Sequence, residues 1–274
     1  MSLNMVDIIT EKGTSLQLPL QNMSSGYYIK DILGLDPVKA EIVSSSFGTV
    51  DGAQYQSARR ESRNIVITMG FNPDFVTTTV SSLRHALYAL LMPKSRIFMR
   101  LHMDDGLVVE IEGRVESFEA PLFTKDPQAV LSVICFNPDF YETTGELVNG
   151  NTVSTNVEQS FNYDGNIQTG FIFKLNLNRS LTEFTLYHRT SENIINQINF
   201  VGSLVSGDVL SISTIAGNKY ARLKRGGSES SVLYTIQPSS VYTQLVSGVN
   251  YIRAYATGAA IPFSLEYVNK YGGL

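Results

Sequence analysis

The sequence has one cysteine, Cys135, and no tryptophan in 274 residues. A single cysteine excludes an internal disulfide framework, and with no second ligand nearby it argues against a zinc site, so Cys135 is expected to be a small core residue. The N-terminal stretch MSLNMVDIITEKG lacks a basic region followed by an apolar run. No window approaches the ~20 apolar residues of a membrane span. We therefore expect no signal peptide and no membrane insertion, in a protein made in a cytoplasm.

Motifs for catalysis, metals and cofactors are also missing. The three histidines, His85, His102 and His188, are far apart, and none forms an HxH or HExxH spacing. No GxxxxGK[ST] or GxGxxG segment supplies a phosphate cradle. Asp104 and Asp105 are adjacent and precede Gly106, which is typical of a turn and not of two carboxylates flanking a glycosidic bond. We expect no catalytic, cofactor-binding or metal-binding residues and no enzymatic activity.

Charge of one sign is not concentrated anywhere. The formal net charge is −4, from 21 basic and 25 acidic residues, so we expect no specific nucleic-acid binding. The densest basic cluster is QSARRESRNI, with Arg59, Arg60 and Arg63 and with Tyr55 just before it. Such a cluster can simply be solvated, but planar guanidinium groups also pair well across interfaces. These four residues are the candidate inter-subunit contacts.

Alternating apolar residues dominate the first half of the chain. NIVITMGF places Ile65, Ile67, Met69 and Phe71 on one face, as a half-buried strand requires. RIFMRLHM and LVVEIEG alternate in the same way around Asp104–Gly106. A three-residue loop matches their buried faces, and it pairs Met103 with Leu107, Leu101 with Val109 and Met99 with Ile111.

One segment has helical spacing, from about residue 76 to 91. Its apolar residues are Val80, Leu83, Leu87, Leu90 and Leu91. A threonine run offers N-caps before it, and Pro93 stops it. We expect this helix to lie on a sheet.

A change of composition near Gly145–Gly150 predicts two domains, 1–147 and 148–274. After the Asn-, Gly- and Thr-rich LVNGNTVSTN, short strand-like runs follow at intervals close to ten residues with no second helix. This spacing is typical of a β-sandwich. The stretch up to about Leu35, including the turn-rich QNMSSG, has weak periodicity and is expected to be an extended N-terminal arm that orders on a neighbour.

FNPDF occurs twice, at Phe71–Phe75 and Phe136–Phe140. Each copy follows an alternating strand, and its proline disfavours helix at the preceding Asn and removes a ladder donor. We interpret both as strand exits in which Asn and Asp take the turn hydrogen bonds and both phenylalanines anchor the chain on the sheet.

Several segments together resemble the distal tail proteins of long-tailed bacteriophages. They are, in order, GLDPVKAEIVSSSFGTVDGAQYQSARRESRNIVI, LSVICFNPDFYE, GDVLSISTIAGNKYARL, LVSGVNYIRAYA and FSLEYVNKYGGL. The strand that runs into Cys135–Tyr141 and the turn with Leu245, Gly248 and Asn250 match the family pattern. Ser213 and Thr214 depart from it, because many relatives have Asp-Thr there.

The resemblance implies a mainly β structural protein and not an enzyme. The first domain would be a tail-tube-like β-sandwich or split barrel with one helix and an extended arm, and it would form a hexameric ring at the distal end of the tail tube. The second would be a galectin-like β-sandwich. Implied partners are further copies of the chain, the tail tube protein, a tail-associated tip protein, and receptor-binding or baseplate proteins. The chain would lie in the virion tail, and it can be monomeric before assembly.

Two other functions stay open at this point. A carbohydrate-binding module is suggested by the tyrosines of the second domain, Tyr163, Tyr187, Tyr220, Tyr234, Tyr242, Tyr251 and Tyr255, although such residues in alternating strands ordinarily pack on a sheet. A tail-tip cell-wall hydrolase is the other, because residues distant in sequence can meet in a fold.

Overall fold

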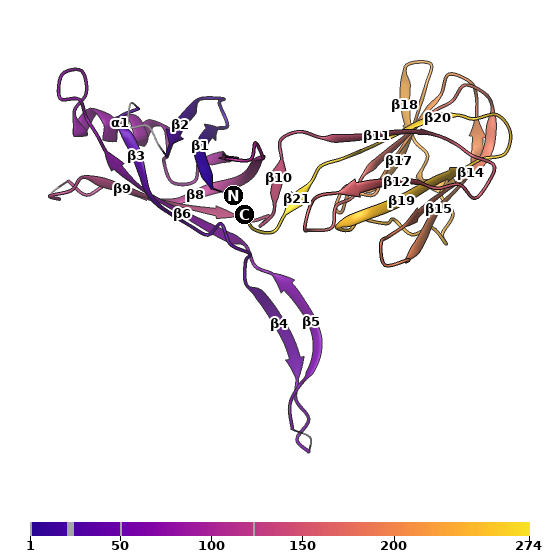
Figure 1. The fold of residues 1–274 in the computed structure, drawn as a ribbon, viewed down its shortest axis with the longest axis horizontal. Helices are drawn as coiled ribbons and strands as arrows, with labels where there is room; N and C mark the ends of the chain where they lie inside the picture. Colours follow the sequence, from indigo (N-terminus) through magenta and orange to yellow (C-terminus); the bar gives the residue numbers. More distant parts are fainter. Residues whose placement is uncertain (1, 21–24, 50, 123) are drawn as a thin grey trace. The chain divides into compact units, whose positions relative to one another are not determined.

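A computed structural model describes residues 2–20, 25–49, 51–122 and 124–274. The chain divides into two compact units (Figure 1). The N-terminal unit comprises Met1–Thr143 together with Tyr271–Leu274, and the C-terminal unit comprises Thr144–Lys270. The division expected from the sequence, 1–147 and 148–274, places the boundary a few residues later and assigns Tyr271–Leu274 to the second domain. Leu274 donates its backbone N–H to the carbonyl oxygen of Leu35, so the last residues return to the N-terminal unit, which a composition change cannot reveal.

The N-terminal unit contains one curved sheet, a separate two-stranded hairpin (β4 and β5) and one described helix. Its elements are β1 (Leu3–Thr10), β2 (Ser15–Pro19), β3 (Tyr27–Leu33), β4 (Ala40–Ser45), β5 (Gln54–Arg60), β6 (Arg63–Phe71), α1 (Val80–Leu90), β7 (Arg96–Met103), β8 (Val108–Glu119), β9 (Gln128–Cys135), β10 (Phe140–Glu142) and β21 (Lys270–Tyr271). The strands are ordered β2-β1-β7-β8-β9-β6-β3, and β10 joins β8 and β21 at the side. The two ends of this path, β2 and β3, approach each other, which makes the sheet a split barrel around an apolar core.

The N-terminal stretch is not the expected arm. β1 lies inside the sheet between β2 and β7, with Val6 and Ile8 both 1% exposed. The alternation of Val6 and Ile8 with Asp7 is short, because the apolar Met5 and Ile9 flank it and break the period of two. Asp7 is itself buried, and its Oδ2 lies 3.0 Å from His102 Nε2. Residues 1 and 21–24 of the predicted arm, most of QNMSSG, lie outside the described residues.

The predicted hairpin register is confirmed. Met99 faces Ile111 and Leu101 faces Val109 in the β7–β8 pair, and the N–H of Met103 donates to the carbonyl oxygen of Leu107. Gly106 has a φ of 91°, the left-handed conformation that a three-residue loop requires.

The helix starts later than the sequence suggested. Thr79 is the N-cap of α1 and forms a capping box with Ser82, and Leu83 and Leu87 bury the apolar face. Residues 76–78 form instead a tight loop, because the Asp74 carboxylate accepts hydrogen bonds from the backbone N–H groups of Val76, Thr77 and Thr78. A carboxylate that satisfies backbone donors in this way competes with helix formation.

Both FNPDF segments are strand exits, but each buries only one phenylalanine. β6 ends at Phe71, which is 6% exposed, while Phe75 is 78% exposed. β9 ends before the second copy, where Phe136 is 75% exposed and Phe140 is fully buried. The pattern reverses because Phe71 is the last inward residue of its strand, whereas Phe140 is the first inward residue of β10.

The C-terminal unit contains two antiparallel sheets around one core. Its elements are β11 (Glu146–Asn151), β12 (Gln159–Tyr163), β13 (Ile172–Asn176), β14 (Leu181–Arg189), β15 (Ile195–Leu204), β16 (Val209–Ser213), β17 (Tyr220–Arg225), β18 (Ser228–Ser231), the 3-10 helix η1 (Leu233–Thr235), β19 (Gly248–Tyr255) and β20 (Pro262–Tyr267). The sheet orders are β11-β20-β13-β16-β17-β18 and β12-β19-β14-β15. Stacked and tilted rings of Phe173, Phe184, Phe200 and Phe263 fill the space between them. The predicted β-sandwich is thus confirmed.

Candidate assembly surface

β4 and β5 form a hairpin that pairs with no other described strand. Figure 1 draws it as a two-stranded extension of the N-terminal unit, which we call the arm (residues 39–49 and 51–61). Every residue of β5 is exposed, and the arm presents the apolar side chains of Ile42 (65% exposed) and Phe47 (58% exposed) to solvent. A two-stranded hairpin without a sheet or helix behind it is only marginally stable in water. The arm therefore has the features of a segment that packs on another molecule.

Three of the four predicted contact residues lie on the arm. Tyr55 is 64% exposed. The Arg59 guanidinium lies 2.6 Å from the Glu41 carboxylate on the facing strand, and its side chain is 80% exposed. Arg60 forms an ion pair with Asp139 at the base of the arm, where the Asp139 side chain is 6% exposed. The sequence predicted an extended segment at the N-terminus and not here, so the position of these three residues on the arm is shown by the structure alone.

Arg63 differs from the other three, because it is 1% exposed and unavailable to a second subunit. Its guanidinium donates to four backbone carbonyl oxygens, those of Pro138 (2.8 Å), Gly34 (2.5 Å), Asp36 (2.6 Å) and Gly272 (2.6 Å). It also lies 4.4 Å from the centroid of the Phe140 ring. Burial lowers the pKa of this guanidinium, and the nearby Cys135, Asp139 and Asp36 oppose that effect. Arg63 therefore joins β6, the base of the arm, the second FNPDF exit and the returning C-terminal residues.

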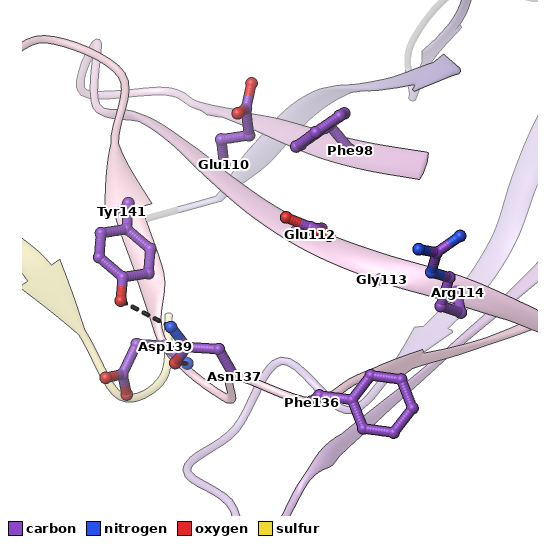
Figure 2. A pocket seen from close by; sticks show the side chains of 9 residues that line it. All are labelled: Phe98, Glu110, Glu112, Gly113, Arg114, Phe136, Asn137, Asp139 and Tyr141. Carbon is purple, nitrogen blue, oxygen red and sulfur yellow. Dashed lines mark hydrogen bonds between the residues drawn. The ribbon is translucent and has the colours of Figure 1, made fainter. Parts of the chain in front are cut away.

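A groove of about 370 Å³ lies next to that junction, over the outer face of β7 and β8 (Figure 2). Its lining consists of Phe98, Glu110, Glu112, Gly113, Arg114, Phe136, Asn137, Asp139 and Tyr141. Asn137 donates to the Tyr141 hydroxyl at 2.6 Å. No sequence motif predicts this groove. The repeated FNPDF is the one sequence feature that coincides with it, because its second copy supplies Phe136, Asn137 and Asp139.

The carboxylates of the groove are held by arginines of the neighbouring strand. Arg96 makes two hydrogen bonds to Glu112, at 2.7 and 2.9 Å, and Arg100 donates to Glu110 at 2.8 Å. The bonds from Arg96 lower the pKa of Glu112. A carboxylate fixed in its charged form is suited to polar contact and poorly suited to proton transfer near neutral pH. In the described part of the chain, no three His, Cys, Asp or Glu side chains are grouped to hold a metal ion.

Three of the tyrosines of the C-terminal unit, Tyr163, Tyr187 and Tyr251, are buried or lie against an arginine. Tyr163 is 1% exposed in the core. On β14 and β19 the guanidinium of Arg253 lies 4.0 Å from the Tyr187 ring centroid, and that of Arg189 lies 3.7 Å from the Tyr251 centroid. Arg189 also makes an ion pair with Glu158. A sugar needs an uncovered ring face for stacking, and these two rings already contact a cation.

A buried polar network lies inside the C-terminal unit. His188 is fully buried, with Nδ1 2.6 Å from the Thr243 hydroxyl and Nε2 3.0 Å from Asn250 Oδ1. Asn250 donates to the carbonyl oxygens of Val246 and Gly248. Gly248 has a φ of 89°, which a residue with a side chain rarely adopts. The Leu245–Asn250 turn thus depends on Gly248 for its backbone and on Asn250 for its hydrogen bonds.

This network predicts a loss of stability in mild acid. Burial lowers the pKa of His188 below 6.5, and the hydrogen bond to Asn250 only partly opposes this. Below about pH 6.5 the unfolded chain binds a proton at this residue that the folded chain does not, so stability present above that pH is lost as the pH falls. We expect a slope approaching about 1.4 kcal/mol per pH unit between about pH 6.5 and the lowered pKa. Urea unfolding followed by circular dichroism at several pH values measures it.

Two histidine variants separate this residue from other titrating groups. His188→Gln should remove the slope while lowering stability at all pH values. His85→Gln, at an exposed position of α1, should leave the slope unchanged. A slope in His188→Gln equal to that of the wild type would disprove the assignment.

Comparisons with known proteins agree with this architecture. A family model described as siphovirus-type tail component, C-terminal domain, matches residues 164–271. The solved structure of the Dit protein of phage SPP1, described as a paradigm of the hub adsorption apparatus in phages that infect Gram-positive bacteria, has a TM-score of 0.68. The identity is 14%, over 97% of this chain and 98% of that one. A chain of the phage P2 baseplate in its activated conformation with Ca has a TM-score of 0.50 at 9% identity over 100% of both chains.

A search of curated proteins finds no match to the sequence. None of the described helices is both long and apolar enough to cross a membrane. The identities to the solved structures are low, so those structures support the fold, while the family match covers most of the C-terminal unit. Residues 164–271 therefore match the siphovirus-type tail component family, and the chain as a whole has the fold of the SPP1 Dit protein.

Proposed function

We propose that this chain is a structural subunit of a phage tail that forms a hexameric ring at the distal end of the tail tube. The ring would be a hub that joins the tube to tail-tip, baseplate and receptor-binding proteins, and DNA would pass through its bore. The observation that most supports this role is the similarity in fold to SPP1 Dit, a hub protein, over 97% of the chain. The role needs no catalytic site.

The arm gives the proposal a physical basis in this chain. Its exposed strands and apolar side chains need a partner to be buried. A head-to-tail contact between identical subunits closes into a ring when the rotation permits. We assign Tyr55, Arg59 and Arg60 to this contact. Arg63 holds the base of the arm through its hydrogen bonds to the carbonyl oxygens of Gly34 and Asp36.

The net charge of −4 suits a conduit for DNA. Affinity for DNA grows with the number of phosphate contacts made by lysine and arginine. An acidic chain without a basic stripe would let the polyanion pass without binding it tightly.

A pair of substitutions on the arm tests the proposal. Ile42→Asp with Tyr55→Asp should abolish the oligomer by placing charges at the contact. It should leave the unfolding curve of the monomer within about 0.5 kcal/mol of the wild type, because both side chains are exposed. Native mass spectrometry of the chain, alone and after assembly with the tail-tube protein, should give six chains of 30.3 kDa for the wild type under at least one of these conditions and one for the variant under both.

The matched control places two charges on exposed residues of the C-terminal unit, Leu233→Asp and Val241→Asp. It should assemble as the wild type does. Six-chain assemblies of the arm variant would show that the arm is not part of the ring contact.

A further inference from the structure

The loop before α1 presents two adjacent apolar side chains to solvent. Phe75 is 78% and Val76 89% exposed, and with Tyr234 they are the most exposed large apolar residues in the described part of the chain. We call Phe75 and Val76 the knob. A single exposed apolar residue is ordinary, but two neighbours in a fixed loop form a contact surface.

Asp74 holds the knob in place. Its carboxylate accepts hydrogen bonds from three backbone N–H groups and from the hydroxyls of Thr77 and Thr78. These bonds, led by that from the Thr77 side chain, lower the pKa of Asp74. The hydrogen bonds to Asp74 therefore hold the backbone of an acidic loop. The side chains of Phe75 and Val76 point to solvent, and nothing in the described chain covers them.

The backbone of the knob is strained. Phe75 has a φ of 57°, a left-handed conformation that is uncommon for an aromatic residue. Among the described non-glycine residues only Lys94 (φ 75°) and Asn193 (φ 60°) share this feature, and asparagine tolerates it well. Strain that the fold maintains against its cost is typical of contact and switch sites.

Lys94, the other unfavourable case, lies beside an apolar pocket at the opposite end of α1. The pocket has a volume of about 360 Å³ and is lined by Tyr88, Leu91, Met92, Pro93 and Phe118. The Tyr88 and Phe118 rings meet edge to face at 5.6 Å, and the N–H of Lys94 donates to the carbonyl oxygen of Val115 at 2.8 Å. The backbone of Lys94 is thus fixed directly after Pro93, at the edge of this apolar pocket.

We infer that the knob of one copy inserts into this pocket of the next copy. The two features cannot meet within one chain, because α1, with 11 residues, holds them roughly 16 Å apart or more. They match in chemistry: an aromatic and an aliphatic side chain face an apolar hollow, and the acidic Asp74 accompanies the knob while the basic Lys94 borders the pocket. A knob and a pocket at opposite ends of one helix make a heterologous contact that repeats from subunit to subunit. The inference rests on the proposed ring and specifies one of its contacts.

Disulfide crosslinking of rings tests this contact directly. Val76→Cys combined with Met92→Cys, at positions 89% and 55% exposed in the monomer, should give a ladder of crosslinked species up to six chains on mild oxidation of rings assembled alone or with the tail-tube protein. Mixing the two single variants should give dimers only, and each single variant alone should give none. The native Cys135 does not compete, because it is buried and burial raises its pKa to about 12.

A second variant measures the contribution of the knob. Phe75→Asn removes the aromatic ring, and asparagine tolerates the left-handed backbone, so the monomer should fold normally. The concentration needed for half-assembly should rise about tenfold or more, as expected when a central aromatic anchor is lost. Tyr234→Asn, an equally exposed aromatic residue on the C-terminal unit, should leave it unchanged.

The possible outcomes separate this contact from the ring itself. Rings that form without crosslinks, or with Phe75→Asn assembling like the wild type, would overturn the knob-and-pocket contact and leave the ring intact. If Val76→Cys alone crosslinked to another tail protein, the knob would contact that protein and not the pocket of the next copy, and the inference would be overturned. Absence of rings under every condition would overturn both the contact and the proposed function.

Discussion

Arg63→Ala is expected to lower the free energy of unfolding of the N-terminal unit by about 4 kcal/mol. The substitution leaves four backbone carbonyl oxygens without their donor, and a buried polar group without a partner costs about 1–3 kcal/mol. It also removes the guanidinium from the Phe140 ring and leaves a cavity, because Arg63 is 1% exposed. Urea unfolding by circular dichroism gives the size of the loss. Hydrogen exchange in β6 and β9 assigns it to this unit.

The controls for Arg63 distinguish its geometry from its charge. Arg63→Lys keeps the charge but cannot reach four carbonyl groups with one ammonium, so about 2 kcal/mol should still be lost. Arg59→Ala, at an 80% exposed side chain, should change stability by less than about 0.5 kcal/mol. A loss below about 1 kcal/mol for Arg63→Ala would contradict the role given to this residue.

Asn250→Ala is expected to destabilise the C-terminal unit by about 3 kcal/mol. Asn250 is fully buried, donates to the carbonyl oxygens of Val246 and Gly248, and lies within hydrogen-bond distance of His188 Nε2. Alanine would leave several buried groups unpaired at once, including the ring N–H of the histidine, and each costs about 1–3 kcal/mol less any relaxation. Urea unfolding, with hydrogen exchange in β14 and β19, measures the loss.

Asn162→Ala provides the matched control. Asn162 is exposed on β12 of the same unit, so its side chain should contribute less than about 0.5 kcal/mol. If both substitutions cost the same, or if the loss from Asn250→Ala appeared in the N-terminal unit, the network would not stabilise the turn as described.

The sequence predicted those features that depend on periodicity. The alternation in β6, β7 and β8 predicts the correct buried faces, and matching those faces predicts the β7–β8 register. The helix was located by its apolar spacing, although its start was placed too early because the role of Asp74 depends on a loop and not on a repeating pattern. The two-sheet architecture of the second half followed from regular strand spacing.

The features that the sequence did not reveal depend on contacts between distant residues. Met5 and Ile9 flank the alternating Val6, Asp7 and Ile8 and break the period of two, so the pattern does not distinguish this inner strand from an arm. Arg63 was grouped with the exposed arginines because charge and spacing say nothing about burial. The real arm has β-strand propensity like any other hairpin, and only the tertiary structure shows that it lies on no sheet.

Negative-stain electron microscopy of the purified chain, alone and together with its tail-tube protein, tests the central claim most directly. The account predicts six-fold rings, formed by the chain itself or when the tube protein is added, with the rings at one end of the tubes. Particles that remain single chains under both conditions and bind no tube would contradict the assignment of this protein as the ring-forming hub of the distal tail.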